Sequence, residues 1–404
     1  MTPHIPNGLA FEVDEYRQRQ ERVRAVLAAR GIDVLYVTSP SNLYYLTGYV
    51  ASWYPPRLPV GLAIHRSDPR IVFFDWTRHV DYVDLITLYD EAEFFDYGTA
   101  AHCVATALAA RDWAGGSVAL EWYSPTPVAA VVNSLADALT AGGSEVVSGD
   151  WIVDNLRLYK SPSEIERIRR ASAILDDSFT QLASELRAGM TELEIASRLA
   201  YLLAERGSEV AAQHPLVSSG PSAWADVHAF PSRRVIQSGD IVSIDASAVI
   251  DRYHVNLSRA FAIDTMNELA RDLLERTQSC VDTLLSEAVL GEGPERAMSL
   301  AEQQLRSTIP AENIWWVGGY SLGLAFPPSW VGHTYLANDG LEKVVLDPGY
   351  LSNFETVIFD REQGFEACAI DTVLMTEHGL VVLSTLPRAL LLVGENVEHI
   401  TTVS

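Results

Sequence analysis

Hydrophobic positions in the first part of the chain recur with helical and strand spacing in alternation. Apolar residues three or four positions apart predict helices, one of them a single turn, at residues 13–30, 42–48, 100–111 and 127–140. Short apolar runs between turn-forming residues predict strands at residues 34–38, 59–65, 70–75 and 117–122. Gly31 follows the first helix, where a glycine commonly ends one. This alternation predicts an α/β domain whose sheet is covered by helices.

A different pattern begins near residues 155–161. Four helices are predicted there, in two pairs that are each followed by strands, at residues 163–187, 191–206, 267–290 and 294–308. Ser163 and Glu166 have the spacing of a capping box at the start of the first of these helices. We therefore expect two domains, residues 1–155 and residues 156–404, which is an ordinary division for a chain of this length.

Polar residues interrupt an apolar hairpin pattern at residues 239–261. One apolar run leads to Asp245, a turn is expected at Asp251–Arg252, and a second run carries Asn256 and Arg259. A carboxylate on an apolar strand is costly to bury unless a partner neutralises it. The alternatives are a functional carboxylate and a strand-end aspartate that a turn satisfies.

Composition and charge narrow the classes of function. The 404 residues are 48% hydrophobic and carry a net charge of −24, with a pI near 4.7. This charge argues against nucleic acid and anionic membranes as partners and favours a cationic or zwitterionic ligand. No signal peptide pattern or membrane-spanning apolar run is present, so we expect a cytoplasmic protein. No CxxC or CxxH spacing links the three cysteines, Cys103, Cys280 and Cys368.

Several segments, in order along the chain, resemble one family. They are VDEYRQRQERVRAVLAARGIDVLYVTSPSNLYYLTGY, LRLYKSPSEIERIRRAS, GDIVSIDASA with YHVNLSRAF, VGGYSLGL, LDPGYLSNFETVI and FEACAIDTVLMTEHG. The chain resembles the creatinase/prolidase/methionine-aminopeptidase family, M24, over nearly its whole length. The resemblance implies an α/β (α+β) fold, with a creatinase-like N-terminal domain at residues 1–155 and a pseudo-symmetric pita-bread catalytic domain at residues 156–404.

The resemblance also locates the family's five metal-binding positions. Asp245 stands at the first aspartate and Glu355 at the first glutamate. Asn256 replaces the second aspartate, Tyr320 the histidine, and Ile370 the second glutamate. Two of five ligands remain, and a two-metal site needs several oxygen donors and a histidine. We therefore expect no metal and no other cofactor.

Two alternatives for the second glutamate ligand stay open, because a small gap in the alignment with the family would place Glu366 or Asp371 at that position. The departures from prolidase resemble the metal-independent branch of the family, creatinase and ectoine hydrolase. Within that branch, GYSLGLAFPPSW and RYHVNLSRAF look most like ectoine hydrolase, although Ala260 replaces a threonine there. The substrate therefore stays open.

Three histidines are candidates for the site. His228 lies in a Gly/Pro/Ser-rich loop, at the position of the family's proton-shuttling histidine, and we expect it to act as general base and acid. His254 precedes Asn256 by two residues and would bind substrate, orient His228, or only bond to backbone groups. His333 is a weaker candidate after the PPSW segment.

The N-terminal domain carries a further candidate segment, Trp53-Tyr54-Pro55-Pro56-Arg57. In creatinase-like homodimers, a loop here reaches the partner's active site and an arginine binds the substrate carboxylate. The resemblance assigns this role to Arg57, since arginine suits a carboxylate, with Trp53, Tyr54 and Trp224 as aromatic walls. The alternatives are an exposed loop arginine and core aromatics.

These expectations combine into one function. Without a metal, the carboxylates of Asp245 and Glu355 would repel each other unless a cation lay between them. We expect metal-independent hydrolysis of a C–N bond in a small amidine, guanidine or amide, with Tyr320 or Asn256 stabilising the tetrahedral intermediate. The alternatives are a lyase or other non-hydrolytic reaction in the same pocket, and a non-catalytic pseudo-peptidase that binds peptides. A metallopeptidase is disfavoured by the lost ligands.

Overall fold

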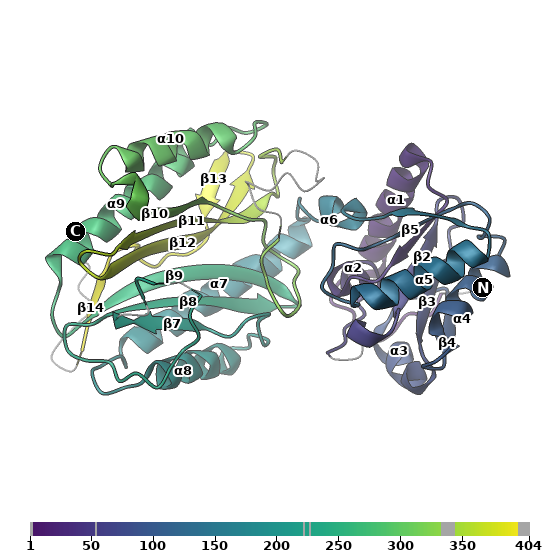
Figure 1. Cartoon of the computed structure of the whole chain (residues 1–404), viewed down its shortest axis with the longest axis horizontal. Coiled ribbons are helices and arrows are strands. Elements are labelled where there is room, and N and C mark those ends of the chain that lie inside the picture. Colours follow the sequence, from purple (N-terminus) through teal and green to yellow (C-terminus); the bar gives the residue numbers. More distant parts are fainter. Residues whose placement is uncertain (1–2, 53–54, 221–222, 226–227, 333–343, 395–404) are drawn as a thin grey trace. The chain divides into compact units, whose positions relative to one another are not determined.

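Two compact units make up the computed structural model of the chain, Met1–Arg157 and Leu158–Ser404 (Figure 1). The structure describes residues 3–52, 55–220, 223–225, 228–332 and 344–394. Each unit is built around its own sheet.

The first unit contains a six-stranded mixed sheet in the order β4-β3-β2-β1-β5-β6. Its strands are β1 (Val34–Val37), β2 (Gly61–His65), β3 (Ile71–Trp76), β4 (Glu91–Phe95), β5 (Ser117–Leu120) and β6 (Glu145–Ser148). Its helices are α1 (Val13–Arg30), α2 (Pro40–Thr47), α3 (Val80–Ile86), α4 (Ala100–Ala109), α5 (Ala129–Ala141) and α6 (Ile152–Leu156), with short 3-10 helices η1 (Pro55–Arg57) and η2 (Thr77–His79). The predicted alternation of helices and strands is confirmed.

Local sequence explains both the predicted and the unpredicted elements of this unit. Gly31 ends α1 in the left-handed conformation, at φ 70°, and its N–H bonds back to the helix. The central strand β1 is buried at all four positions, so its sequence is a continuous apolar run that predicts a strand. The outer strands β4 and β6 were not predicted, because they are largely half-buried or exposed and carry mixed sequences.

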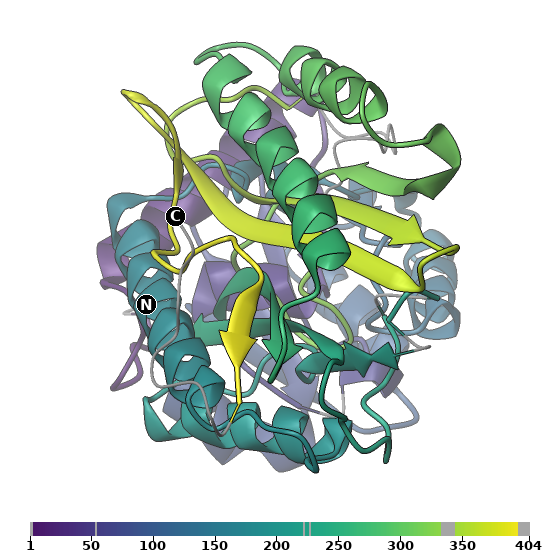
Figure 2. The same cartoon turned by 90° about the vertical axis from the view of Figure 1, so that its left-hand side faces the viewer.

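The second unit contains one antiparallel sheet path, β10-β11-β12-β9-β8-β7, to which β13 adds beside β12 and β14 beside β9. Its strands are β7 (Leu216–Ser219), β8 (Ile241–Ile250), β9 (Tyr253–Ile263), β10 (Ile314–Gly318), β11 (Leu351–Asp360), β12 (Phe365–Thr376), β13 (Gly379–Val382) and β14 (Leu391–Val393). Its helices are α7 (Pro162–Ala183), α8 (Glu192–Glu205), α9 (Glu268–Glu287) and α10 (Glu295–Arg306), with the short 3-10 helix η4 (Ala311–Asn313). Helix α7 packs on β8 and β9, and α9 packs across β11 and β12 (Figure 2).

The start of α7 corrects one prediction. Ser161, not Ser163, is the N-cap: its hydroxyl accepts from the backbone N–H of Glu164, whose carboxylate accepts from Ser161 N. Pro162 decides this register, because proline has no N–H and fits the first helical position. The capping box therefore lies two residues earlier than the spacing of Ser163 and Glu166 indicated.

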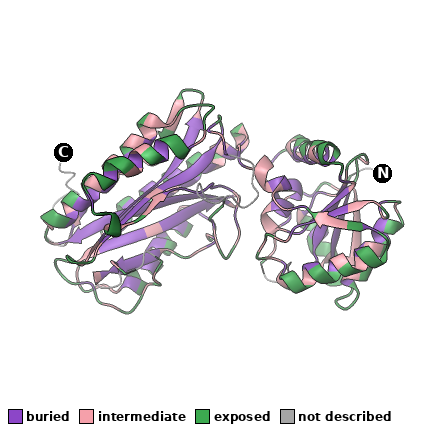
Figure 3. Ribbon diagram, turned by 45° about the horizontal axis from the view of Figure 1, so that its top comes forward, coloured by how far each residue is buried: buried purple, intermediate pink, exposed green. Residues whose placement is uncertain are grey.

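The hairpin β8–β9 forms as predicted. Ten residue pairs join the strands, from Ile241 opposite Ala262 to Ile250 opposite Tyr253. Asp251 and Arg252 make the turn with φ 48° and 64°, and two positive φ values suit the twist of a two-residue hairpin. The long strands are buried along most of their length, while the outer helix faces are exposed (Figure 3).

Candidate active site

One row of paired residues crosses the sheet of the second unit. Gly318 lies opposite Glu355, Glu355 opposite Ile370, Ile370 opposite Ser258, and Ser258 opposite Asp245. Directly opposite residues in a sheet share a face. We call this the site face. Asp245 on β8 and Glu355 on β11 are the carboxylates of this row, each partly buried, and β9 and β12 lie between their strands.

Two asparagines link these carboxylates. Asn256 donates through Nδ2 to Asp245 Oδ1 at 2.5 Å and to the Ala246 carbonyl at 3.3 Å. Asn353 donates through Nδ2 to Glu355 Oε1 at 2.6 Å and to Asn256 Oδ1 at 3.3 Å. A continuous hydrogen-bonded chain therefore runs from Glu355 to Asp245.

Tyr320 completes this chain. Its backbone N–H donates to Asn353 Oδ1 at 2.9 Å, and its carbonyl accepts from Asn353 N at 3.0 Å. Its buried hydroxyl lies 3.4 Å from Asn256 Oδ1 and accepts from Trp330 Nε1 at 3.2 Å. The phenol that stands in place of the family's metal histidine is thus held against the site.

Thr372 closes the gap between β9 and β12. Its hydroxyl accepts from Asn256 N and donates to Asn256 O, both at 2.8 Å. It therefore performs the hydrogen bonding that a backbone ladder would supply, and it fixes the strand segment that carries Asn256.

The pKa values of Asp245 and Glu355 are both raised, and the described part of the site lacks an ion-pair partner for these carboxylates. Burial, and then the charge of Glu355, raise the pKa of Asp245 to about 8, against the hydrogen bond from Asn256. Burial also raises the pKa of Glu355, partly offset by hydrogen bonds from Tyr320 and Asn353 and by the charge of His228. Within the part of the chain that the structure describes, neither carboxylate forms an ion pair.

The residues at the family's metal positions do not fit a two-metal site. The register puts Ile370, not a carboxylate, opposite Glu355. Asp371 faces the other side of the sheet, where it binds Arg259 at 2.8 Å. Glu366 lies four residues from Ile370, about 13 Å along the strand. Both gapped alternatives are therefore wrong.

The described segments also hold no group of three or more histidine, cysteine, aspartate or glutamate residues arranged for a metal ion. We derive no chemical step through a metal.

His228 lies where its charge reaches the site, since it lowers the pKa of Glu355. Its exposed ring meets Trp315, at the start of β10, edge to face with 5.7 Å between ring centroids. The histidine expected to shuttle protons therefore lies within electrostatic range of the Glu355 carboxylate.

His254 is fully buried and structural. Its Nε2 accepts from the Ala212 backbone N–H at 3.0 Å, so Nδ1 carries the hydrogen that bonds the Arg252 carbonyl at 2.9 Å. Burial, and then the charge of Arg252, lower its pKa to about 3. Both ring nitrogens are used by the backbone, which matches the last of the three interpretations of this residue.

The remaining candidates divide between the two units. Trp53, Tyr54 and His333 lie outside the described residues. Arg57 ends η1 in the first unit and is exposed. Trp224 packs, with Trp316, against an apolar cluster that includes Ile370. Sequence reasoning missed Asn353, Thr372 and Trp330. The signal for Asn353 was its place two residues before Glu355 on the same strand, hence on the same face.

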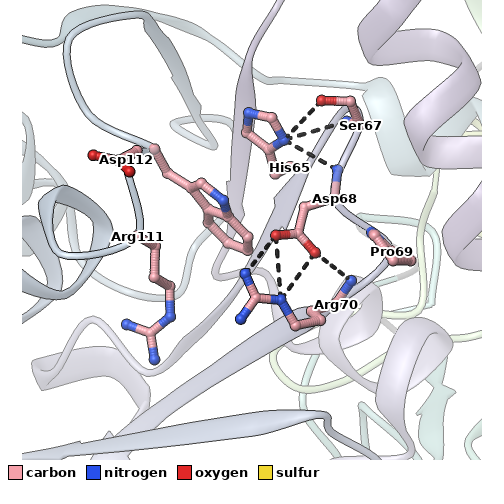
Figure 4. Close-up of a pocket in the computed structure, with 8 residues that line it drawn as sticks. His65, Ser67, Asp68, Pro69, Arg70, Arg111 and Asp112 are labelled. Atoms are coloured by element: carbon pink, nitrogen blue, oxygen red, sulfur yellow. Dashed lines mark hydrogen bonds and ion pairs between the residues drawn. The ribbon is translucent and has the colours of Figure 1, made fainter. Parts of the chain in front are cut away.

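A hollow of about 500 Å³ lies in the first unit (Figure 4). Its two arginines form ion pairs within the fold. Arg70 donates through Nε and Nη2 to Asp68, and Arg111 binds Glu91 and Glu93. The His65 ring accepts from neighbouring backbone N–H groups. We assign it no catalytic role.

The fold agrees with what the chain resembles. The chain belongs to metallopeptidase family M24, whose model matches residues 166–377, and the creatinase/prolidase N-terminal domain model matches residues 19–159. The α/β architecture with a pita-bread catalytic unit is thereby confirmed. No helix in the described ranges is long and apolar enough to span a membrane.

The individual relatives carry the names of different enzymes. An ectoine hydrolase of Halomonas elongata is 24% identical, over 96% of this chain and 99% of its own. A probable dipeptidase, PepE, of Mycobacterium tuberculosis is 27% identical over 95% and 98%. An X-Pro aminopeptidase structure from Thermotoga maritima superposes with a TM-score of 0.79 at 22% identity, over 93% of this chain and 99% of its own. The X-Pro aminopeptidase structure shares the fold of this chain, and the family is hydrolytic.

Proposed function

We propose that the chain is a metal-independent hydrolase that cleaves a C–N bond in a small cationic amidine, guanidine or amide. One observation carries this proposal: amide groups, not metal ligands, hold the two site-face carboxylates. Amide N–H groups of Asn256 and Asn353 occupy one oxygen each of Asp245 and Glu355. Such a site offers acceptors to a ligand that brings N–H donors and positive charge.

The charge balance supports a cationic ligand. Two carboxylates on one face repel each other when both are ionised, and here no arginine or lysine of the described segments pairs with them. An amidinium or guanidinium group would offset this repulsion, and its N–H groups would donate to the carboxylate oxygens. The acidic chain as a whole would attract the same ligand.

The mechanism uses His228 as base and then acid. His228 takes a proton from water, the water oxygen forms a bond to the amidinium carbon, and Asp245 with Glu355 holds the cation. The O–H of Tyr320, which lies 3.4 Å from Asn256 Oδ1, or an N–H of Asn256 turns to the tetrahedral intermediate and stabilises it. The C–N bond then breaks and His228 returns the proton to the leaving nitrogen.

The relatives suggest two candidate activities. The ectoine hydrolase resemblance spans the whole chain and favours ectoine, a cyclic amidine. The dipeptidase relatives favour a metal-dependent dipeptidase, which is disfavoured because Asn256, Tyr320 and Ile370 replace three ligands.

The active form is also part of the proposal. By resemblance, the enzyme is a cytoplasmic homodimer without a nucleic acid or membrane partner, in which Arg57 and Trp53 of one protomer serve the partner's site. Mixing an Arg57→Ala protein with a His228→Ala protein tests this. Recovered activity in the mixture supports a shared site. If the subunits have exchanged to form mixed dimers and no activity is recovered, the shared site is contradicted.

The test of the function begins with metal content, measured by mass spectrometry on protein purified without chelators. Ectoine, creatine and Xaa-Pro dipeptides are then offered with and without added Mn²⁺, and products are identified by mass. We expect hydrolysis of an amidine or guanidine without metal, with product mass raised by one water. Stoichiometric metal with metal-dependent dipeptide cleavage would overturn the proposal, and product without added water would indicate a lyase.

A matched pair of probes tests the chemistry of recognition. Acetamidinium and tetramethylammonium carry the same charge, but only acetamidinium has N–H groups. Because the carboxylate oxygens are acceptors, we expect acetamidinium to bind, with tetramethylammonium at least about tenfold weaker by calorimetry. Equal affinities would point to an aromatic cage in place of the carboxylates.

A further inference from the structure

Asn353 is fully buried on β11 and uses every polar atom of its side chain. Its Oδ1 accepts the backbone N–H of Tyr320 at 2.9 Å, and its Nδ2 donates to Glu355 and to Asn256. None of its side-chain atoms is left without a partner. No position of the family's metal set includes it, and the mechanism above does not use it directly.

These bonds have a fixed direction. A backbone N–H can only donate, so the atom of Asn353 that faces Tyr320 N must be the oxygen, and the amide nitrogen must face Glu355 and Asn256. Asn256 therefore presents its oxygen to Asn353, which leaves its nitrogen toward Asp245. The Tyr320 backbone N–H thus determines the orientation of the Asn353 amide, and the Ala246 carbonyl, which only accepts, holds the Asn256 amide in the matching orientation.

We propose that Asn353 is a positioning residue, whose amide transmits the direction set by the Tyr320 backbone N–H to Glu355 and thereby orients that carboxylate for a cationic ligand, beside the Asn256 amide that holds Asp245. Each carboxylate receives an amide N–H on one oxygen, and this bond fixes the direction in which its remaining acceptor positions face. The identity of that ligand rests on the proposed function, whereas the orienting role of Asn353 does not.

The orienting role has no equivalent elsewhere on the strand. Thr356, also buried on β11, points to the opposite face, because successive residues of a strand alternate. Its substitution by valine removes one hydroxyl at nearly constant volume. Thr356→Val is therefore a matched control for a buried polar-to-apolar change on this strand.

The first test needs no ligand. Crystal structures of Asn353→Leu and Asn353→Ser are compared with that of the unchanged protein: leucine is similar in size but cannot hydrogen-bond, and serine is too short to reach Tyr320, Asn256 and Glu355 together. We expect Glu355 to adopt a different rotamer in both variants and to keep its rotamer in Thr356→Val. Unchanged Glu355 and Asn256 side chains in either Asn353 variant would overturn the proposal, and the serine variant decides if the leucine variant does not fold.

The second test measures the consequence for binding. Acetamidinium affinity is measured by calorimetry for the same proteins. Loss of a hydrogen bond to a charged group predicts at least about a tenfold loss of affinity in both Asn353 variants and none in Thr356→Val. Equal affinity in all proteins would overturn the orienting role.

The two tests separate the two proposals. If the unchanged protein binds no acetamidinium while Glu355 turns in the variant crystals, the proposed function fails and the positioning role stands. If acetamidinium binds equally to every protein and Glu355 does not move, the positioning role fails and the proposed function stands.

Discussion

The two faces of the catalytic sheet treat carboxylates in opposite ways, and adjacent residues of β12 show it. Asp371 faces one side, where Arg259 binds its Oδ1 at 2.8 Å and Arg388 lies 3.7 Å from its Oδ2. Ile370 faces the other side, between Glu355 and Ser258. On that side the carboxylates meet amides and a phenol, and no cation from the described residues.

The difference separates a structural carboxylate from a functional pair. The charge of Asp371 is neutralised within the fold, and Arg259 also donates through Nη1 and Nη2 to the carbonyls of Ser258, Ile370 and Leu386. Asp245 and Glu355 keep unmatched charge, which folding alone would disfavour. Sites that keep such groups are candidates for ligand binding. The predictions below test this contrast from the largest expected effect to the smallest.

Replacing His228 should have the largest effect. Removal of a general base and acid typically lowers the rate by about 10²–10⁴-fold, so we expect a loss of kcat of that size in His228→Gln with an amidine substrate. The free energy of unfolding should not change, because the ring is exposed. Steady-state kinetics and urea denaturation measure both quantities.

A second exposed loop histidine provides the control. His214 stacks on Phe230 with 4.9 Å between ring centroids, much as His228 meets an aromatic ring. His214→Gln should leave kcat unchanged. Equal losses in the two variants would remove His228 from the mechanism.

The next prediction compares carboxylates from the two faces directly. Asp371→Asn leaves the buried Arg259 charge without its partner, so we expect a loss of about 3–5 kcal/mol in the free energy of unfolding. Glu355→Gln removes one of two like charges, so stability should be unchanged or higher, while acetamidinium affinity falls at least about tenfold. Denaturation and calorimetry on both variants measure the contrast.

The opposite pattern would reverse the assignment of the two faces. If Glu355→Gln destabilised the fold as much as Asp371→Asn and left binding unchanged, Glu355 would be a structural carboxylate. The cation pocket would then be wrong.

Local sequence was sufficient for much of the fold. The α1 helix with its terminal Gly31, and the β8–β9 hairpin with its turn at Asp251–Arg252, depend on neighbours in sequence and formed as predicted. The α7 cap shows the limit. The segment Lys160-Ser161-Pro162-Ser163 offers two serines, and the constraint of proline, not spacing, selects between them.

The site could be predicted only in part, because strand register is not local. A shift of one residue moves a side chain to the other face, so sequence alone left Glu366, Ile370 and Asp371 as alternatives. The observed pairing with Glu355 and Ser258 decides among them. Partners distant in sequence explain the other gaps. The Ala212 N–H satisfies His254 from 42 residues away, and the Tyr320 N–H orients Asn353 from 33 residues away.

The smallest predicted effect, taken per pH unit, is a pH dependence of stability. The pKa of Asp245 rises from an ordinary 3.8 to about 8 on folding, so between these values the folded protein holds a proton that the unfolded chain releases. The free energy of unfolding should therefore fall as the pH rises from 4 to 8, by at most about 1.4 kcal/mol per pH unit from this group. Its stabilising contribution is complete below pH 4 and lost as the pH passes 8.

Asp245→Asn isolates that contribution, because an amide does not titrate. The slope of unfolding free energy against pH should be less negative in the variant than in the unchanged protein, and the difference should end near pH 8. Acetamidinium should shift the difference to lower pH, since a bound cation favours the ionised carboxylate. Identical slopes with and without Asp245 would mean that the pair is already neutralised, as Asp371 is on the other face, and that the contrast between the faces does not hold.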